Sequence, residues 1–99
     1  MLTMYRILPA QRAAARQLGV TIMPSRIAGK KIDVYKNGFR VATIGDIRYS
    51  DYHQYVKAEK RGILKKGTAN ERRRLYRIRH AGENLKRGSA GYYAWYILW

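Results

Sequence analysis

Alternating apolar and polar positions between residues 31 and 45 predict a β-hairpin. The two runs of the pattern flank Asn37-Gly38, a pair typical of the type I′ turn, in which both central residues need positive φ. An isolated hairpin is only marginally stable in water, so a third strand or a packed helix has to support it. Residues 20–23 are the candidate for that third strand.

Apolar residues at helical spacing predict four helices, each with a start or stop signal. Pro9 and Gly19 bracket the first, an Ala-rich segment that has few large apolar residues to bury. Ser50 and Ser89 are the expected N-caps of the second helix and of the last. The predicted helices cover residues 9–18, 50–61, 68–81 and 89–98.

The third of these helices determines where several arginines point. Thr68 followed by Glu71 has the form of a capping box, and Gly82 is the expected C-terminal stop. The side chains expected to face the core are apolar or have an apolar stem: Leu75, Ile78 and Arg74. Those expected on the opposite side are basic: Arg73, Arg77 and His80.

Together these elements predict a small α+β fold, in which the hairpin packs against two or three helices. We divide the chain into a basic N-terminal arm with a short helix, residues 1–29, and a compact basic domain, residues 30–99. The arm either orders against a partner or docks loosely on the domain. The last predicted helix is apolar almost all round, so it forms the centre of the core or meets another subunit in a homo-oligomer.

The composition adds an unusual charge. The 99 residues include 21 Lys and Arg against 6 Asp and Glu, a formal net charge of +15, and no Cys. Such a charge opposes folding of the bare domain unless a polyanion neutralises it, and each Lys or Arg that meets a phosphate releases a counterion. Nucleic acid is therefore the expected partner, DNA before RNA, with an anionic membrane or an acidic protein surface as the alternatives.

The residues expected to contact nucleic acid are mostly basic and are concentrated between residues 57 and 79. The basic ones are Lys57, Lys60, Arg61, Lys65, Lys66, Arg72, Arg73, Arg77, Arg12 and Arg16. Tyr76, which lies among arginines, and Tyr49 are the tyrosines expected to stack on bases. The aromatic residues expected in the core are Tyr35, Tyr55, Tyr93, Trp95 and Trp99.

Neither catalysis nor metal binding is expected. His53 and His80 fall in different predicted helices and outside any zinc-ligand spacing, and the phosphate-binding glycine motifs are absent. We therefore predict no catalytic residue, no metal site and no cofactor, and thus no enzyme. No apolar run approaches the roughly 20 residues of a membrane-spanning helix, so we expect a soluble protein without a membrane span.

Residues 30–99 carry a pattern that resembles a known protein family. The pattern consists of Asp51-Tyr52, Arg72, Tyr76, Arg79-His80, Gly91 and the closing Leu98-Trp99. It resembles a small basic domain of unknown function encoded by giant DNA viruses and bacteriophages. The resemblance implies a protein of the virion, or otherwise of the host-cell cytoplasm, that binds the packaged genome. The alternative is a minor structural capsid protein that contacts acidic surfaces of a major capsid protein and bridges subunits.

Four residues of that pattern are also expected to form an internal network: Asp51, Arg79, His80 and Trp99. An acid at the start of one helix can pair with an arginine at the end of another, and a buried arginine has to be paired. The alternative is that Arg79 and His80 hold a phosphate.

Overall fold

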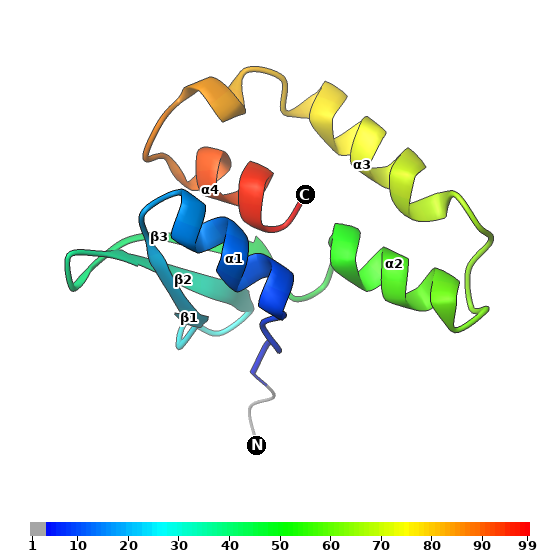
Figure 1. Cartoon of the computed structure of the whole chain (residues 1–99), viewed down its shortest axis with the longest axis horizontal. Helices are drawn as coiled ribbons and strands as arrows, with labels where there is room; N and C mark the ends of the chain where they lie inside the picture. The colour runs from blue at the N-terminus through cyan, green and yellow to red at the C-terminus, as the bar shows by residue number, and fades with distance from the viewer. Residues whose placement is uncertain (1–3) are drawn as a thin grey trace.

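A three-stranded antiparallel sheet and four α-helices make up the computed structural model, which describes residues 4–99 (Figure 1). The predicted α+β class is therefore confirmed. The elements follow in the order α1 (Pro9–Gln17), β1 (Thr21–Pro24), β2 (Lys30–Lys36), β3 (Phe39–Asp46), α2 (Tyr52–Lys60), α3 (Thr68–Arg79), the short 3-10 helix η1 (Glu83–Leu85) and α4 (Ala90–Ile97).

The sheet contains the predicted hairpin and the predicted third strand. Its order is β1-β2-β3, and Asp33 of β2 lies between Met23 of β1 and Thr43 of β3. Asn37 and Gly38 both have positive φ, at 52° and 82°, as a type I′ turn requires. The local turn signal therefore predicted both the position and the conformation of the hairpin.

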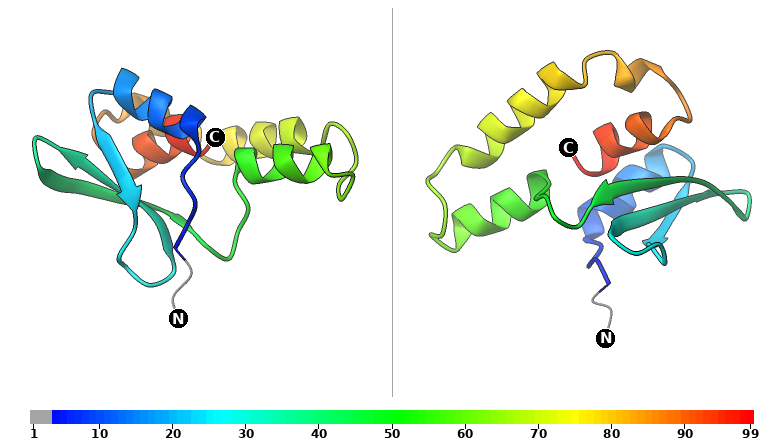
Figure 2. Two further views of the ribbon diagram at one scale, coloured as in Figure 1. Left: turned by 60° about the horizontal axis from the view of Figure 1, so that its bottom comes forward. Right: turned by 180° about the vertical axis from the view of Figure 1, so that it is seen from behind.

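Helices α1 and α4 cover one face of the sheet (Figure 2). Ile32 and Val34 of β2 are fully buried there beside Ile97 of α4 and Ala15 of α1. This confirms the last helix as a central part of the core. The boundary predicted at residue 30 has no counterpart in this fold, because α1 and β1 supply core residues and an edge strand; residues 1–3 of the predicted arm lie outside the described part.

The opposite face of the sheet holds a buried carboxylate. Asp33 is 1 % exposed, and its Oδ1 accepts hydrogen bonds from Ser25 Oγ at 2.7 Å and from Thr43 Oγ1 at 2.8 Å. Burial by itself raises the pKa of Asp33. These hydrogen bonds outweigh the effect of burial, with a contribution from Arg40 at 3.9 Å, so the pKa of Asp33 is lowered overall.

Replacing Asp33 with Asn should reduce the amount of folding stability that the protein loses at acidic pH. Because the folded-state pKa of Asp33 lies below its ordinary value of 3.8, the ionised carboxylate stabilises the fold above that pH, and this stabilisation is lost as the pH falls through the folded-state pKa. Between about pH 4 and pH 2 the wild type should therefore lose more stability than Asp33→Asn. Thermal unfolding followed by circular dichroism measures the difference, and parallel curves would contradict the prediction.

Helices α2 and α3 lie side by side and extend away from the sheet (Figure 2). The N-cap of α2 is Asp51 rather than the predicted Ser50: Asp51 Oδ1 accepts from Gln54 N, and Gln54 Oε1 accepts from Asp51 N, both at 3.0 Å. A carboxylate with a Gln three residues later satisfies two backbone groups, which the exposed Ser50 does not.

The predicted capping box at the start of α3 is wrong. The N-cap is Gly67, with φ 94°, and no side chain caps the helix. Thr68 Oγ1 donates instead to the carbonyl of Lys65 at 2.6 Å, while Glu71 pairs with Arg74 at 2.6 Å. A left-handed residue lets the chain reverse sharply between α2 and α3, and glycine adopts it without a Cβ clash.

Candidate nucleic-acid interface

The densest group of exposed basic side chains lies on the basic hairpin, by which we mean α2, α3 and their connection, residues 52–79. The predicted binding residues exposed on it are Lys57, Lys60, Arg61, Lys65, Lys66, Arg72 and Arg77, whereas Arg73 is partly buried. Arg12 and Arg16 are exposed on α1, a different element, where Arg12 Nη1 donates to the carbonyl of Ile22 at 3.2 Å. The structure therefore brings most of the predicted residues onto one unit and leaves these two elsewhere.

Three arginines of α3 rest on aromatic rings from neighbouring helices. The pairs, with the distance from Cζ to the ring centroid, are Arg73 over Tyr52 (4.1 Å), Arg77 over Trp95 (5.4 Å) and Arg72 over Tyr55 (5.8 Å). A guanidinium held over a ring keeps N–H groups at its edge that can donate to a phosphate. The rings restrain the arginines in the unbound protein, so less side-chain entropy is lost when an anion binds.

The inward face of α3 differs from the predicted one. Of the three residues predicted to face the core, Leu75 is partly buried, but Ile78 is 59 % exposed and Arg74 is exposed in its pair with Glu71. Ala69, which is 1 % exposed, and the partly buried Tyr76 face the protein instead. The reason is that α3 packs through arginine–aromatic and aromatic–aromatic contacts, so the spacing of its aliphatic residues does not mark the buried side.

All six carboxylates of the protein have partners inside it, and all of them lie within the described residues. The ion pairs are Asp33–Arg40, Asp46–Arg48, Asp51–Lys31, Glu71–Arg74 and Glu83–His80, and Glu59 accepts from the backbone N–H of Gly67. Only four of the 21 Lys and Arg residues are in these pairs, so the other 17 have no carboxylate partner within residues 4–99. The net positive charge is therefore carried on the surface almost without compensation.

The two tyrosines predicted to stack on bases have different surroundings. Tyr76 stacks on Trp99, with centroids 4.5 Å apart and planes at 9°, and also on His80, at 4.2 Å and 21°. Both of its faces are thus occupied, and the prediction for Tyr76 is wrong; burial and the Glu83 carboxylate raise its pKa to about 12. Tyr49, in contrast, is 68 % exposed.

The aromatic residues predicted in the core are buried to different degrees. Tyr93 is 4 % exposed and belongs to the central cluster. The others are partly buried: Tyr35, Tyr55, Trp95 and Trp99. Two of these, Tyr55 and Trp95, support arginines of α3 and therefore contribute to the candidate interface as well as to packing.

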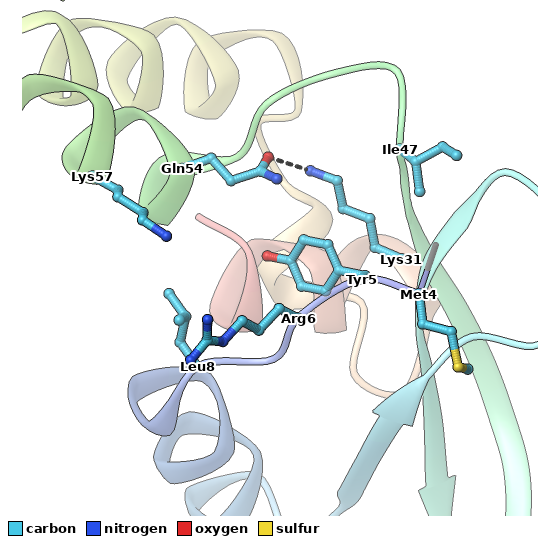
Figure 3. A pocket seen from close by; sticks show the side chains of 8 residues that line it. All are labelled: Met4, Tyr5, Arg6, Leu8, Lys31, Ile47, Gln54 and Lys57. Atoms are coloured by element: carbon cyan, nitrogen blue, oxygen red, sulfur yellow. Dashed lines mark hydrogen bonds between the residues drawn. The ribbon is translucent and has the colours of Figure 1, made fainter. Parts of the chain in front are cut away.

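Asp51 does belong to a buried network, but its partners are not the predicted ones. Figure 3 shows three other members of the network, Tyr5, Lys31 and Gln54, with the hydrogen bond between Lys31 and Gln54. Lys31 Nζ lies 3.0 Å from Asp51 Oδ2 and 3.0 Å from Gln54 Oε1, and the two charged residues are 2 % and 1 % exposed. Tyr5 donates its hydroxyl proton to Asp51 Oδ2 at 2.5 Å, and Gln11 Nε2 donates to the Tyr5 hydroxyl at 2.8 Å. This network joins the N-terminal segment, α1, β2 and α2.

The three residues predicted to pair with Asp51 lie near it without bonding to it. Arg79 is exposed, His80 Nδ1 lies 2.8 Å from Glu83 Oε2, and Trp99 stacks on Tyr76. The prediction placed these residues near one another but gave Asp51 the wrong partner, because the Asp51 carboxylate already pairs with Lys31. No pattern in the sequence distinguishes Lys31 from the solvent-facing lysines of an ordinary hairpin.

Lys31 lines two cavities. The first, of about 320 Å³, opens beside the N-terminal segment, where Arg6 and Lys57 extend to its edge (Figure 3). The second, of about 630 Å³, is called the aromatic cavity below. Its lining includes Tyr49, Tyr55, Tyr76, Trp99, Arg72, Arg79, His80, Asp46 and Asp51. It therefore collects all four residues of the predicted network, although not as a hydrogen-bonded set.

Two further properties concern residues 4–99. No group of three or more His, Cys, Asp and Glu side chains in this part of the chain is placed to hold a metal ion. None of its helices has both the length and the apolar character needed to cross a bilayer.

Comparisons with protein-family models, with curated proteins and with solved structures returned no match to this chain.

Proposed function

We propose that the protein binds nucleic acid largely without regard to sequence, through the exposed cations of the basic hairpin. The observation that carries the proposal is the set of 17 Lys and Arg residues without a carboxylate partner. A nucleic acid offers phosphates at short, regular spacing, and binding gains free energy from each condensed counterion that a cation displaces. Such contacts hold the protein on the sugar–phosphate backbone of the nucleic acid but do not distinguish one base sequence from another.

The outer side of α3 supports the same proposal. Arg73 and Arg77, which have no carboxylate partner among the described residues, line a shallow, open hollow together with Asn70, Ile78 and Arg74, the last of which is paired with Glu71. Arginines three and four residues apart lie on one helical face, about 5–6 Å from each other, so one strand of phosphates can meet several of them. Arginine donates two parallel N–H groups to a phosphate, which strengthens each contact.

We infer that the setting is a virion and that the polyanion is a viral or phage genome, DNA rather than RNA. This inference is supported by the resemblance of residues 30–99 to the small basic viral domain and by the excess of surface cations. A packaged genome is a concentrated polyanion, which offsets the mutual repulsion of the cations on the folded domain.

The binding should be strongly dependent on salt. If the hairpin contacts about six phosphates, the affinity for duplex DNA should fall by about a thousandfold between about 50 and 200 mM salt. Two duplexes of equal length and unrelated sequence should bind alike at each salt concentration. Fluorescence anisotropy with labelled duplexes measures both effects. A dissociation constant that changes only a few fold over this range would rule out the electrostatic mechanism.

A second candidate function is supported by exposed apolar side chains that nucleic acid does not need. Phe39 is 75 % exposed at the tip of the β2–β3 hairpin, and Leu85 is 80 % exposed. A minor capsid protein would use such residues against another protein, with its cations on acidic capsid surfaces. A fixed copy number in particles emptied of their genome would favour this function over the first.

A further inference from the structure

We propose that the aromatic cavity receives one unpaired nucleotide of a single strand, with its base on Tyr49 and its phosphates on Arg72 and Arg79. The inference rests on the proposed function and narrows it: a single-stranded segment, an end or a bulge has a contact that a continuous duplex lacks. Three properties of the cavity support the inference: its size, its charge and its free aromatic surface.

The size and position of the cavity suit a nucleotide. Its volume of about 630 Å³ falls within the range of about 300–1,000 Å³ that is usual for small-molecule sites. It opens where the end of β3, the start of α2, the inner side of α3 and the end of α4 meet. The core and the buried Lys31–Asp51 pair hold these elements in place. The cavity is therefore already formed in the unbound protein.

The uncompensated charge of the cavity is positive. Its two carboxylates are already paired, Asp51 with Lys31 and Asp46 with Arg48 at 2.8 Å. Arg72 and Arg79 are exposed and have no carboxylate partner among the described residues. Because they are seven residues apart on α3, they project from the same side of the helix about 10 Å apart along its axis. Phosphates on both sides of a nucleotide in the cavity can therefore meet a cation.

Only one aromatic ring of the cavity has a large free surface. Tyr76 is covered by Trp99 and His80, and the Tyr55 ring lies under Arg72 and 6.3 Å from Trp99. Tyr49 is 68 % exposed and follows Arg48, whose guanidinium lies 5.7 Å from the ring. An unstacked base can pack on such a ring, whereas a base inside a duplex has both faces covered by its neighbours.

The experiment compares Tyr49→Ala with Tyr49→Phe on two probes. These are an oligothymidylate of about 12 nucleotides and a duplex of the same length. Tyr49→Ala should weaken binding of the oligothymidylate about tenfold and leave the duplex affinity unchanged, since stacking on the ring is lost. Tyr49→Phe keeps the ring and should bind both probes as the wild type does. Because Tyr49 is exposed, neither substitution should unfold the protein, and circular dichroism checks this.

A second pair of variants tests the phosphate contact. Arg79→Gln and Arg87→Gln each remove one exposed cation that has no carboxylate partner among the described residues, but only Arg79 lines the cavity, and Arg87 lies outside the basic hairpin. Arg79→Gln should reduce the preference for the oligothymidylate over the duplex about fivefold, whereas Arg87→Gln should leave that ratio unchanged. Trp99 lines the cavity, and Trp95→Phe leaves it as the remaining tryptophan. In this variant, binding of the oligothymidylate should also quench the fluorescence of Trp99.

The outcomes separate the two proposals. If the wild type binds neither probe, the proposed function and the cavity assignment both fail. If it binds both probes with strong salt dependence while Tyr49→Ala affects neither of them, only the cavity assignment is overturned. Equal losses of oligothymidylate and duplex binding in Tyr49→Ala would also overturn it, because they would show a general surface contact.

Discussion

Replacing Lys31 with Met is expected to lower the free energy of unfolding by about 3–5 kcal/mol. The substitution removes one partner of an ion pair whose two side chains are 2 % and 1 % exposed. The Asp51 carboxylate would remain buried and ionised. It would still accept hydrogen bonds from Tyr5 and from Gln54 N, but no cation would neutralise its charge. Since a domain of this size has only about 5–15 kcal/mol of stability, the loss is a large part of the total.

Urea denaturation followed by circular dichroism measures this loss, and the adjacent residue provides the control. Lys30 is on the same strand but exposed, so Lys30→Met removes the same charge without disturbing the network. Lys31→Met combined with Asp51→Asn should be less destabilising than the sum of the two single substitutions, because neither buried charge is then left alone. If Lys31→Met and Lys30→Met have equal effects, the pair is not a structural requirement of the fold.

The parts of the fold that the sequence predicted are those fixed by local chemistry. Asn37-Gly38 determines its own turn, and the two flanking runs alternate with the period of a strand. Pro9 and Ser89 mark helix starts that the structure confirms, and Ser89 Oγ accepts from Tyr92 N at 3.1 Å. Such signals act over a few residues and depend little on the rest of the chain.

The buried network was not predicted because its members come from distant parts of the chain. Tyr5, Lys31 and Asp51 meet only after the N-terminal segment, β2 and the start of α2 have packed together. By its position in an alternating run, Lys31 looks like a solvated residue on the polar face of a strand. The burial of a lysine depends on the carboxylate that tertiary packing brings to it.

The orientation of α3 shows a second limit of the sequence pattern. Leu75 and Ile78 suggested an aliphatic inward stripe, yet only Leu75 is partly buried, and the buried side also includes Ala69 and Tyr76. Arginine is amphipathic, so a helix rich in it can pack through guanidinium–aromatic contacts that a hydrophobicity pattern counts as polar. The charge predicted the surface correctly as cationic, but only the fold shows that aromatic rings hold Arg72, Arg73 and Arg77.

Neutralising four cations at the end of the basic hairpin should weaken binding of duplex DNA by about a thousandfold at about 0.1 M salt if all four contact phosphates. The four residues are exposed and lie in or beside the α2–α3 connection: Lys60, Arg61, Lys65 and Lys66, each replaced by Gln. Each lost phosphate contact also lowers the slope of log K against log salt by about 0.9, so the slope should fall by three to four units if all four make contacts.

A matched variant determines whether location or total charge is responsible. The matched variant lowers the net charge from +15 by the same four units. It replaces four exposed cations outside the basic hairpin: Arg26, Lys30, Lys86 and Arg87. Long-range attraction depends on total charge, so both variants should associate more slowly. Only the hairpin variant should lose most of the salt slope, because the slope counts phosphates neutralised in the complex. Equal slopes in the two variants would mean that the polyanion wraps the whole domain rather than lying on α2 and α3.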